Sequence, residues 1–154
     1  MIDLISAVEL NKVEVDPSWF SIKKCKENPT KLYVFGDNIR RVGNAGQAQI
    51  RICKNSTGLA TKLYPGMEPG DFMSDNLYNE HCMIIDKDIQ KILKVFENKD
   101  NGYTEIVFPI DGLGTGLSKL PEKAPKVYEF LCNKLFVVFG LLTDVNGKLV
   151  KANK

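Results

Sequence analysis

Two short apolar segments, each running directly into a glycine-rich stretch, constrain the fold of this chain more than any other feature. Residues 31–35 read KLYVF and residues 104–108 read TEIVF. Such β-branched and aromatic residues are typical of buried strands. The first segment continues into GDNIRRVGNAGQAQ and the second into PIDGLGTGLSKLP. Strands of an α/β sheet end in this way, because the loops that bind ligands begin at the carboxyl ends of the strands.

Two further strands and a helix are predicted between these segments. Residues 57–63 (TGLATKL) and 82–86 (CMIID) are short apolar runs of strand length. Residues 86–99 then carry apolar side chains at the spacing of a helix face. Those side chains are Ile89, Ile92, Leu93 and Phe96. Strand and helix therefore alternate in this half of the chain.

The last third of the chain predicts a second helix and completes the fold class. Pro121 and Pro125 suit a helix start. The residues after them form an apolar stripe of Val127, Phe130, Leu131 and Leu135. Alternating strands and helices predict a single three-layer α/β/α domain with a mixed, mostly parallel sheet. We assign residues 1–145 to this domain, and we expect the polar residues 146–154 to form a frayed C-terminal tail.

Length and charge narrow the class of protein. The 154 residues suffice for one domain with a core of its own. The 21 basic and 19 acidic residues leave a net charge of +2 without a basic block, so nucleic acid is not an expected partner. No apolar run approaches the ~20 residues that cross a bilayer, and acidic residues stand near the start where a secretion signal is basic. We therefore expect a cytoplasmic protein with no membrane partner.

The cysteines and the histidine do not predict a metal site. Four cysteines stand too far apart for a paired ligand motif, at Cys25, Cys53, Cys82 and Cys132. We expect them to be reduced and mostly buried. With His81 as the one histidine, no Ser-His-Asp or Cys-His pair is predicted unless the fold brings His81 to the site. No metal and no other cofactor is expected.

The glycine-rich segments at residues 36–47 and 111–118 are the candidate functional site. Glycine allows backbone amides to approach a ligand closely and to converge on an anion. A helix that begins after the loop would add its dipole. One such loop by itself is more often a simple turn, and neither matches the Walker A or GxGxxG pattern. Because each follows a predicted strand, we expect both loops to face one crevice that suits a phosphate or diphosphate.

The two segments resemble the ligand-binding loops of macro domains, which are α/β modules that bind ADP-ribose and its derivatives. The resemblance covers residues 31–135 and rests on VFGDNIRRVGNAGQAQI and IVFPIDGLGTGLSKLPEKAPKVYEFL. The chain is similar to a distant branch of that family found in bacteria and their bacteriophages. The resemblance implies a macro-domain-like fold and an ADP-ribose-type ligand.

The resemblance also implies roles for individual residues. Asn38 would contact the distal ribose, residues 43–46 would form the first glycine cluster, and residues 112–117 would wrap the diphosphate. With the position of Asp37 directly after a predicted strand, the candidate catalytic residues are Asp37 and Asn38. The ligand-binding residues would be Gly36, Gly43, Asn44, Ala45, Gly46, Gln47, Asp111, Gly112, Leu113, Gly114, Thr115, Gly116 and Leu117.

Departures from the family pattern support binding better than catalysis. The first cluster lacks a run of three glycines, and neither aspartate nor histidine follows Gly46. The early aspartate that reads adenine in the family is not recognisable. Asp37 suits a general base or a ribose ligand as well as a turn cap, whereas Asp111 suits a cap better. Arg40 and Arg41 could pair with a phosphate, although a solvated pair is commoner.

The longest predicted loop, residues 64–76, is a second candidate region. Four residues in this loop or its approach could close over a ligand: Lys62, Asp71, Ser74 and Asp75. Tyr64 and Phe72 could stack on an adenine or pin the loop to the core. We expect His81 to be a surface or packed residue.

Three functions remain open from the sequence. The first is an enzyme that hydrolyses an ADP-ribosyl or ADP-ribose phosphate bond, with Asp37 or a loop aspartate orienting water. The second is a binding module that sequesters a nucleotide signal or reads ADP-ribosylated macromolecules. The third is a small structural protein whose glycine loops are only turns. The shortage of an acid/base pair favours the second function over the first.

Overall fold

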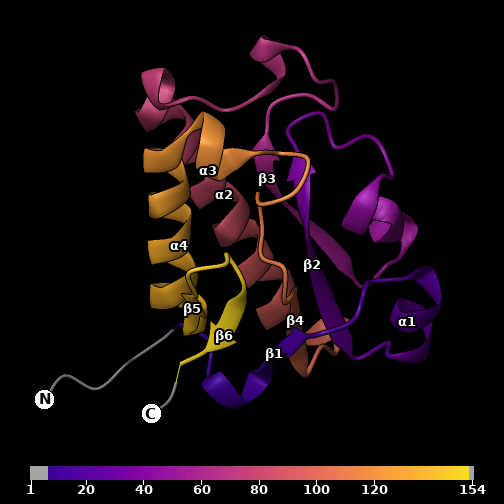
Figure 1. Cartoon of the computed structure of the whole chain (residues 1–154). Coiled ribbons are helices and arrows are strands. Elements are labelled where there is room, and N and C mark those ends of the chain that lie inside the picture. The colour runs from indigo at the N-terminus through magenta and orange to yellow at the C-terminus, as the bar shows by residue number, and fades with distance from the viewer. Residues whose placement is uncertain (1–6, 153–154) are drawn as a thin grey trace, which may run out of the picture.

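A four-stranded parallel sheet forms the centre of the molecule. The computed structural model describes residues 7–152. The strands are β1 (Val13–Asp16), β2 (Lys31–Asn38), β3 (Ser56–Lys62) and β4 (Glu105–Pro109). They pair in parallel in the order β1-β4-β2-β3 (Figure 1). The carboxyl ends of all four strands therefore lie at the same end of the sheet.

Helices cover both faces of this sheet. On one face lie α2 (Tyr78–Glu97), α3 (Leu120–Lys123) and α4 (Pro125–Phe139), and on the other lie α1 (Ile22–Glu27) and the 3₁₀ helix η2 (Gly46–Ile52) (Figure 1). The predicted α/β class is therefore confirmed. No helix in the part of the chain that the structure describes is long and apolar enough to cross a membrane.

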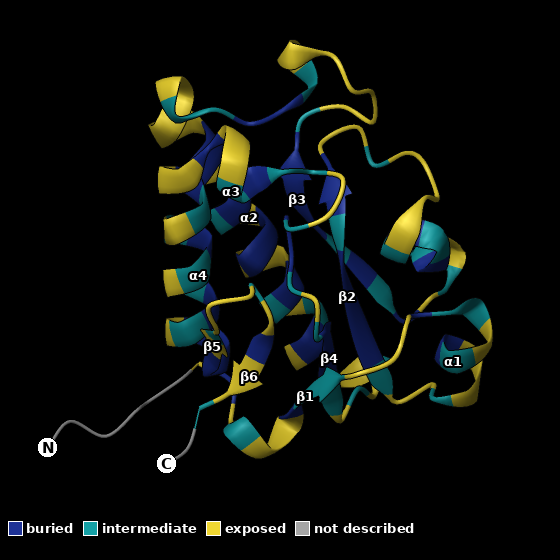
Figure 2. Cartoon of the chain, viewed as in Figure 1, coloured by how far each residue is buried: buried dark blue, intermediate teal, exposed yellow. Residues whose placement is uncertain are grey.

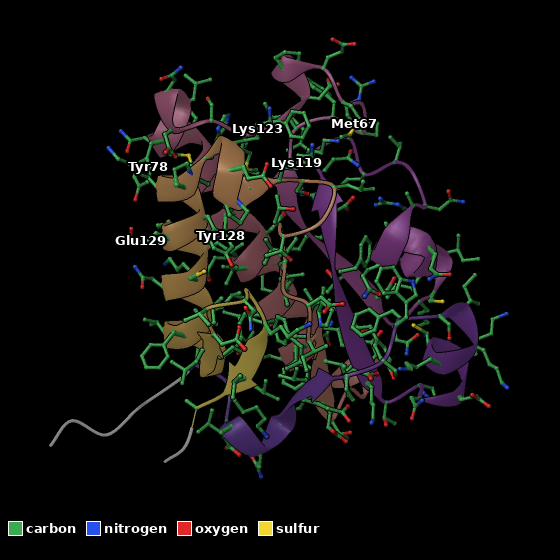
Figure 3. All side chains as sticks on the ribbon, viewed as in Figure 1. Met67, Tyr78, Lys119, Lys123, Tyr128 and Glu129 are labelled. Atoms are coloured by element: carbon green, nitrogen blue, oxygen red, sulfur yellow. The ribbon has the colours of Figure 1, made fainter. Side chains whose placement is uncertain are left out.

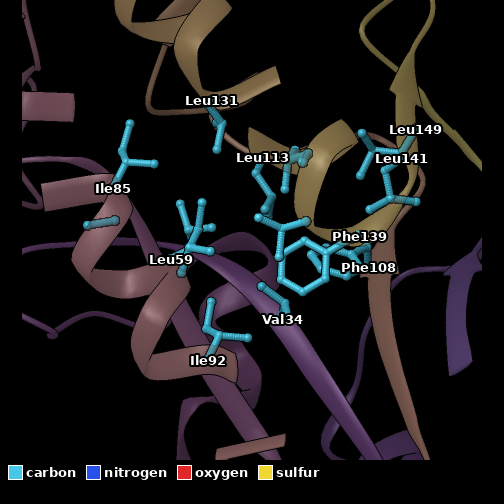
Figure 4. Close-up of a cluster of buried hydrophobic side chains, with 14 of the residues drawn as sticks. Val34, Leu59, Ile85, Ile92, Phe108, Leu113, Leu131, Phe139, Leu141 and Leu149 are labelled. Carbon is cyan, nitrogen blue, oxygen red and sulfur yellow. The ribbon is translucent and has the colours of Figure 1, made fainter. Parts of the chain in front are cut away.

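Each face of the sheet buries its own apolar cluster. The larger cluster lies between the sheet and helices α2 and α4 (Figure 4), and it includes Val34, Leu59, Ile85, Ile92, Phe108, Leu131 and Phe139. The smaller cluster lies under α1 and η2 and includes Phe20, Tyr33, Phe35, Ile50 and Val107. Successive residues of β2 alternate between the two clusters, as the two-residue period of a strand requires. Figure 2 shows the resulting pattern of buried strands and exposed loop tips.

The predicted strand at residues 82–86 is wrong, because these residues lie within α2. The buried side chains of Cys82, Ile85, Ile89 and Ile92 continue one face of that helix. A short apolar run has no period of its own that distinguishes a strand from a helix. The predicted strands at 31–35, 57–63 and 104–108 correspond to β2, β3 and β4.

The expected polar tail at residues 146–154 is folded as far as the structure describes it. Strands β5 (Leu141–Thr143) and β6 (Leu149–Lys151) form an antiparallel pair. The Leu149 side chain is buried, and its backbone N–H donates to the Ile110 carbonyl at 2.8 Å. The hairpin therefore packs beside the start of the second glycine-rich loop, and residue 145 is not a structural boundary.

Candidate functional site

The two glycine-rich loops meet at the carboxyl ends of β2 and β4, as predicted. Gly36 and Gly114 lie so close that a Cβ added to Gly36 would stand 3.9 Å from the Gly114 nitrogen. The Oγ1 of Thr61, on β3, lies 2.8 Å from the Oγ of Ser118. These contacts place both loops along one edge of the domain.

A crevice made of two adjoining hollows runs between the loops. The Asn38 hollow, of about 110 Å³, is lined by Gly36, Asp37, Asn38, Val42, Gly43, Ala45, Ala48, Arg51, Lys62, Pro65, Leu117 and Ser118. The Trp19 hollow, of about 410 Å³, is lined by Trp19, Gly36, Ala45, Gly46, Gln47, Asp111, Gly112, Gly114, Thr115, Gly116, Leu117, Ser118 and Asn146. The hollows share Gly36, Ala45, Leu117 and Ser118, so they form one continuous site.

Most of the residues predicted for the site line this crevice. The exceptions are Asn44, which is exposed, and Leu113, whose side chain is buried in the larger apolar cluster. Leu113 can therefore offer only its backbone to a ligand. Four lining residues fall outside every region that the sequence predicted for the site: Trp19, Ala48, Arg51 and Asn146.

The second loop contains a run of backbone amides without protein acceptors. Within the described residues, the N–H groups of residues 113–118 donate to no protein acceptor. Gly112 and Gly114 have φ values of 85° and 81°, a left-handed conformation that turns consecutive amides toward one side. The Thr115 hydroxyl donates to the Asp111 carbonyl at 2.6 Å and closes the turn. The loop therefore has a row of unpaired donors, and residues 114–118 of this row line the crevice.

Helix dipoles contribute little at this site. The element after the first glycine cluster is the seven-residue 3₁₀ helix η2, where we expected an α-helix, and α3 has only four residues. At the start of α4, the amides of Lys126 and Val127 both donate to the Asp75 carboxylate at 3.1 Å. An anion in the crevice would therefore be bound by loop amides and side chains.

Asp37 is held by arginines beneath the loop. Its carboxylate accepts two hydrogen bonds from Arg51, at 2.7 and 2.8 Å, and Arg41 approaches to 3.5 Å. The Asp37 side chain is only 2% exposed. Gly58 is required beside it, because a Cβ there would stand 2.3 Å from the carboxylate. This arrangement fits a group that positions the loop, and both oxygens are already engaged before any water could be oriented.

Asn38 also bonds to its own loop. Its amide nitrogen donates to the Val42 carbonyl at 2.9 Å, and its oxygen accepts from the Arg40 amide at 3.0 Å. Arg40 lies over the Tyr64 ring at 5.8 Å, and Arg41 pairs with Asp88 at 2.5 Å. Both arginines therefore have protein partners in place of the phosphate that the sequence allowed.

Trp19 is the most prominent side chain that sequence reasoning missed. It is 55% exposed at the lip of the Trp19 hollow. The next residue, Phe20, is fully buried, and its backbone N–H and C=O are bonded by the side chains of Gln47 and Gln49. The backbone that carries Trp19 is thus fixed while its ring is free, which suits stacking on a planar group.

Residues 16–134 match a family of unknown function, DUF7831. The chain belongs to this family. A search of curated proteins and a search of solved structures each gave no significant match. The DUF7831 match includes every residue that lines the crevice except Asn146.

In this DUF7831 chain, the long middle loop is held mainly by its own contacts. Phe72 is 6% exposed and so cannot stack on a base, whereas Tyr64 is 39% exposed. Asp71 accepts from the Glu68 amide at 2.9 Å within the loop. His81 is buried, and its Nδ1 lies 3.0 Å from the Ser74 nitrogen. Asp71, Ser74, Asp75 and His81 therefore have structural partners away from the crevice.

Lys62 is the exception in this region, because it lines the Asn38 hollow. It is only 5% exposed, and its ammonium donates to the Gly66 carbonyl and, at 3.4 Å, to the Pro65 carbonyl. Burial lowers the pKa of Lys62 below its ordinary value, and the charge of Lys119 acts in the same direction. Asp71 opposes this shift only in part.

Asp111 is the acidic residue at the other end of the crevice. It forms an exposed ion pair of 2.7 Å with Lys148 of the C-terminal hairpin, and its side chain is 54% exposed. An exposed pair of this kind adds little stability. Asp111 thus joins the second loop to the hairpin and leaves no free carboxylate fixed at the crevice.

Proposed function

We propose that this protein binds an ADP-ribose-type nucleotide in the crevice and that its domain is macro-like. The free amides of residues 113–118 carry the proposal. Consecutive unpaired N–H groups at a glycine turn form a concave site for an anion, and a diphosphate is an anion that matches such a row. The crevice continues on both sides of this loop, toward Trp19 and toward Asn38.

The two ends of the crevice suit the other parts of the ligand. The exposed ring of Trp19 would stack on a base, and the Asn38 hollow would receive the distal ribose. The Trp19 hollow, of about 410 Å³, has the size expected for a ligand site, and the smaller Asn38 hollow, of about 110 Å³, adjoins it.

Binding without hydrolysis is the form of this proposal that we favour. Both oxygens of Asp37 are bonded to Arg51, and Asp111 is exposed and paired with Lys148. A general base needs an oxygen within reach of the attacking water. The protein would then sequester a nucleotide or read ADP-ribosylated macromolecules, and hydrolysis of the ADP-ribosyl bond is the second candidate.

Trp19 supplies a direct test, because it is the single tryptophan of the chain. ADP-ribose should change its fluorescence, and calorimetry should give the same dissociation constant. Trp19→Ala should weaken ADP-ribose binding by about 1–3 kcal/mol, the range for loss of a stacked base. Trp19→Phe is the matched control and should retain most of the affinity.

Pyrophosphate separates this function from a purely structural role. The unpaired amides should bind pyrophosphate in the wild type and in Trp19→Ala alike, since stacking is not involved. If neither ADP-ribose nor pyrophosphate binds or raises the melting temperature, the glycine loops are only turns and the proposed function is wrong.

A further inference from the structure

Three lysines gather beside the Asn38 end of the crevice. Lys62 lies on β3, Lys119 directly precedes α3, and Lys123 ends α3. The ammonium groups of Lys62 and Lys123 lie 4.7 and 5.0 Å from the centroid of one ring, that of Phe72. Figure 3 labels Lys119 and Lys123 at the same end of the molecule as Met67, whose sulfur is 3.5 Å from the Lys62 ammonium.

Among residues 7–152 no salt bridge involves these three lysines, and the Asp71 charge offsets the effect of burial on Lys62 only in part. The ion pairs between described residues involve other cations: Lys24, Lys31, Arg41, Arg51, Lys134 and Lys148. Lys62 and Lys123 lie over the Phe72 ring, and Lys62 also donates to two backbone carbonyls. The cluster is therefore a concentration of positive charge that forms no ion pair within the described residues.

Such a cluster is costly in the free protein. A charge taken out of water is stable only when it is paired, and like charges nearby add to the cost. The lowered pKa of Lys62 reports this cost, with burial as its main cause and Lys119 as a contributor. Unfavourable charge of this kind is concentrated at functional sites, where a ligand offsets it.

A purely structural role explains only part of the cluster. Lys62 fixes residues 65 and 66 to the end of β3 through their carbonyls, and a single buried lysine would suffice for that. It does not explain Lys119, which has a left-handed φ of 46° and no ion pair within the described chain. Nor does it explain why two ammonium groups share one ring.

We propose that Lys62, Lys119 and Lys123 bind an anionic group of the phosphate class at the Asn38 end of the crevice. Lys62 and Ser118 line the Asn38 hollow, and Lys119 follows Ser118 directly. A ligand whose diphosphate lies on residues 113–118 would reach the lysines with its distal end. The favoured nucleotide therefore carries a phosphate beyond the diphosphate. This preference rests on the proposed function.

Inorganic phosphate tests the anion site without any nucleotide. Calorimetry at low ionic strength should detect binding to the full chain, and added salt should weaken it. Lys119→Gln and Lys123→Gln should each weaken binding about two- to fivefold, as expected for partly exposed charges, and the double variant by about tenfold. The two lysines carry the test because they are more exposed than Lys62, and circular dichroism should show that the variants fold.

Lys99→Gln is the matched control, because it removes one exposed lysine charge near the amino end of β4. It should bind phosphate as the wild type does. The anion site is wrong if the wild type does not bind phosphate, or if the double variant binds it as tightly as Lys99→Gln.

A pair of nucleotides tests the ligand preference. ADP-ribose 1″-phosphate should bind the wild type about tenfold more tightly than ADP-ribose, the equivalent of one charge-assisted contact. The double lysine variant should lose this preference. Equal binding of both nucleotides would overturn the preference while the proposed function stands. Phosphate binding at the lysines with no nucleotide binding would retain the anion site and overturn the proposed function.

Discussion

At the scale of single residues, two side chains at the end of β2 that suit catalysis are instead bonded to other residues of the protein. Asn38 donates to Val42 and accepts from Arg40, and Asp37 is held by Arg51. Each of these contacts spans the loop that forms one wall of the crevice. The two residues therefore determine the shape of the site before any ligand arrives.

The shape-determining role of Asn38 can be measured as stability. Asn38→Ala removes two hydrogen bonds and should lower the free energy of unfolding by about 1–2 kcal/mol in a denaturant titration. Asn38→Asp keeps the acceptor for Arg40 and loses the donor to Val42, so it should fall between Asn38→Ala and the wild type. Unchanged stability in Asn38→Ala would contradict this role.

Asn38→Ala also tests whether Asn38 contacts the ligand. If Asn38 contacts the distal ribose, Asn38→Ala weakens ADP-ribose more than AMP, because AMP lacks that ribose. Equal weakening of both would mean that Asn38 acts only through the loop.

At the scale of elements, two glycines of the second loop have different surroundings: Gly114 is crowded by its neighbours, whereas Gly116 faces open space. A Cβ at Gly114 would stand 3.0 Å from two atoms of Leu120, and its φ of 81° strains any side chain. A Cβ at Gly116 would have no neighbour within 4 Å, and Gly116 lines the Trp19 hollow. The two positions therefore affect folding and binding differently.

A matched pair of alanine variants tests this difference. Gly114→Ala should lower stability by about 1–3 kcal/mol, through backbone strain and crowding. Gly116→Ala should stay within about 0.5 kcal/mol of the wild type, yet it should weaken pyrophosphate and ADP-ribose because the methyl group stands where the anion approaches. Thermal unfolding and calorimetry measure the two effects. The assignment of the anion to this loop fails if Gly116→Ala binds both ligands normally.

At the scale of the whole molecule, the C-terminal hairpin joins the second loop to the core. Leu149 is 2% exposed, whereas its neighbour Val150 is 49% exposed. The ion pair between Lys148 and Asp111 and the bond from the Leu149 amide to the Ile110 carbonyl both end on the segment that leads into the loop. The hairpin therefore belongs to the same folding unit as the crevice.

Two neighbouring truncations test the hairpin. Leu149→Ala should cost about 2–5 kcal/mol, because it leaves a cavity in the core. Val150→Ala should cost less than about 1 kcal/mol, since a half-exposed side chain leaves no closed cavity. Denaturant titration measures both, and similar small losses would mean that the hairpin is only loosely attached.

The sequence by itself determined the elements whose pattern is local. The runs that became β2, β3 and β4 are long enough to show strand character, and the stripe from Ile89 to Phe96 repeats at the period of a helix. The two glycine-rich loops were also recognisable, because glycine clusters after strands have a local conformational cause. From these, the α/β class and the meeting of the loops at one end of a parallel sheet follow.

Only the tertiary structure decided which side chains complete the site. Asp37 and Arg51 are 14 residues apart in sequence, and Asp75 caps a helix whose first amides are 51 and 52 residues away. The exposure of Trp19 and the grouping of Lys62 with Lys119 likewise depend on segments that the sheet brings together. A local pattern carries no record of such partners, because burial and charge pairing are properties of residues distant in sequence that meet only in the folded chain.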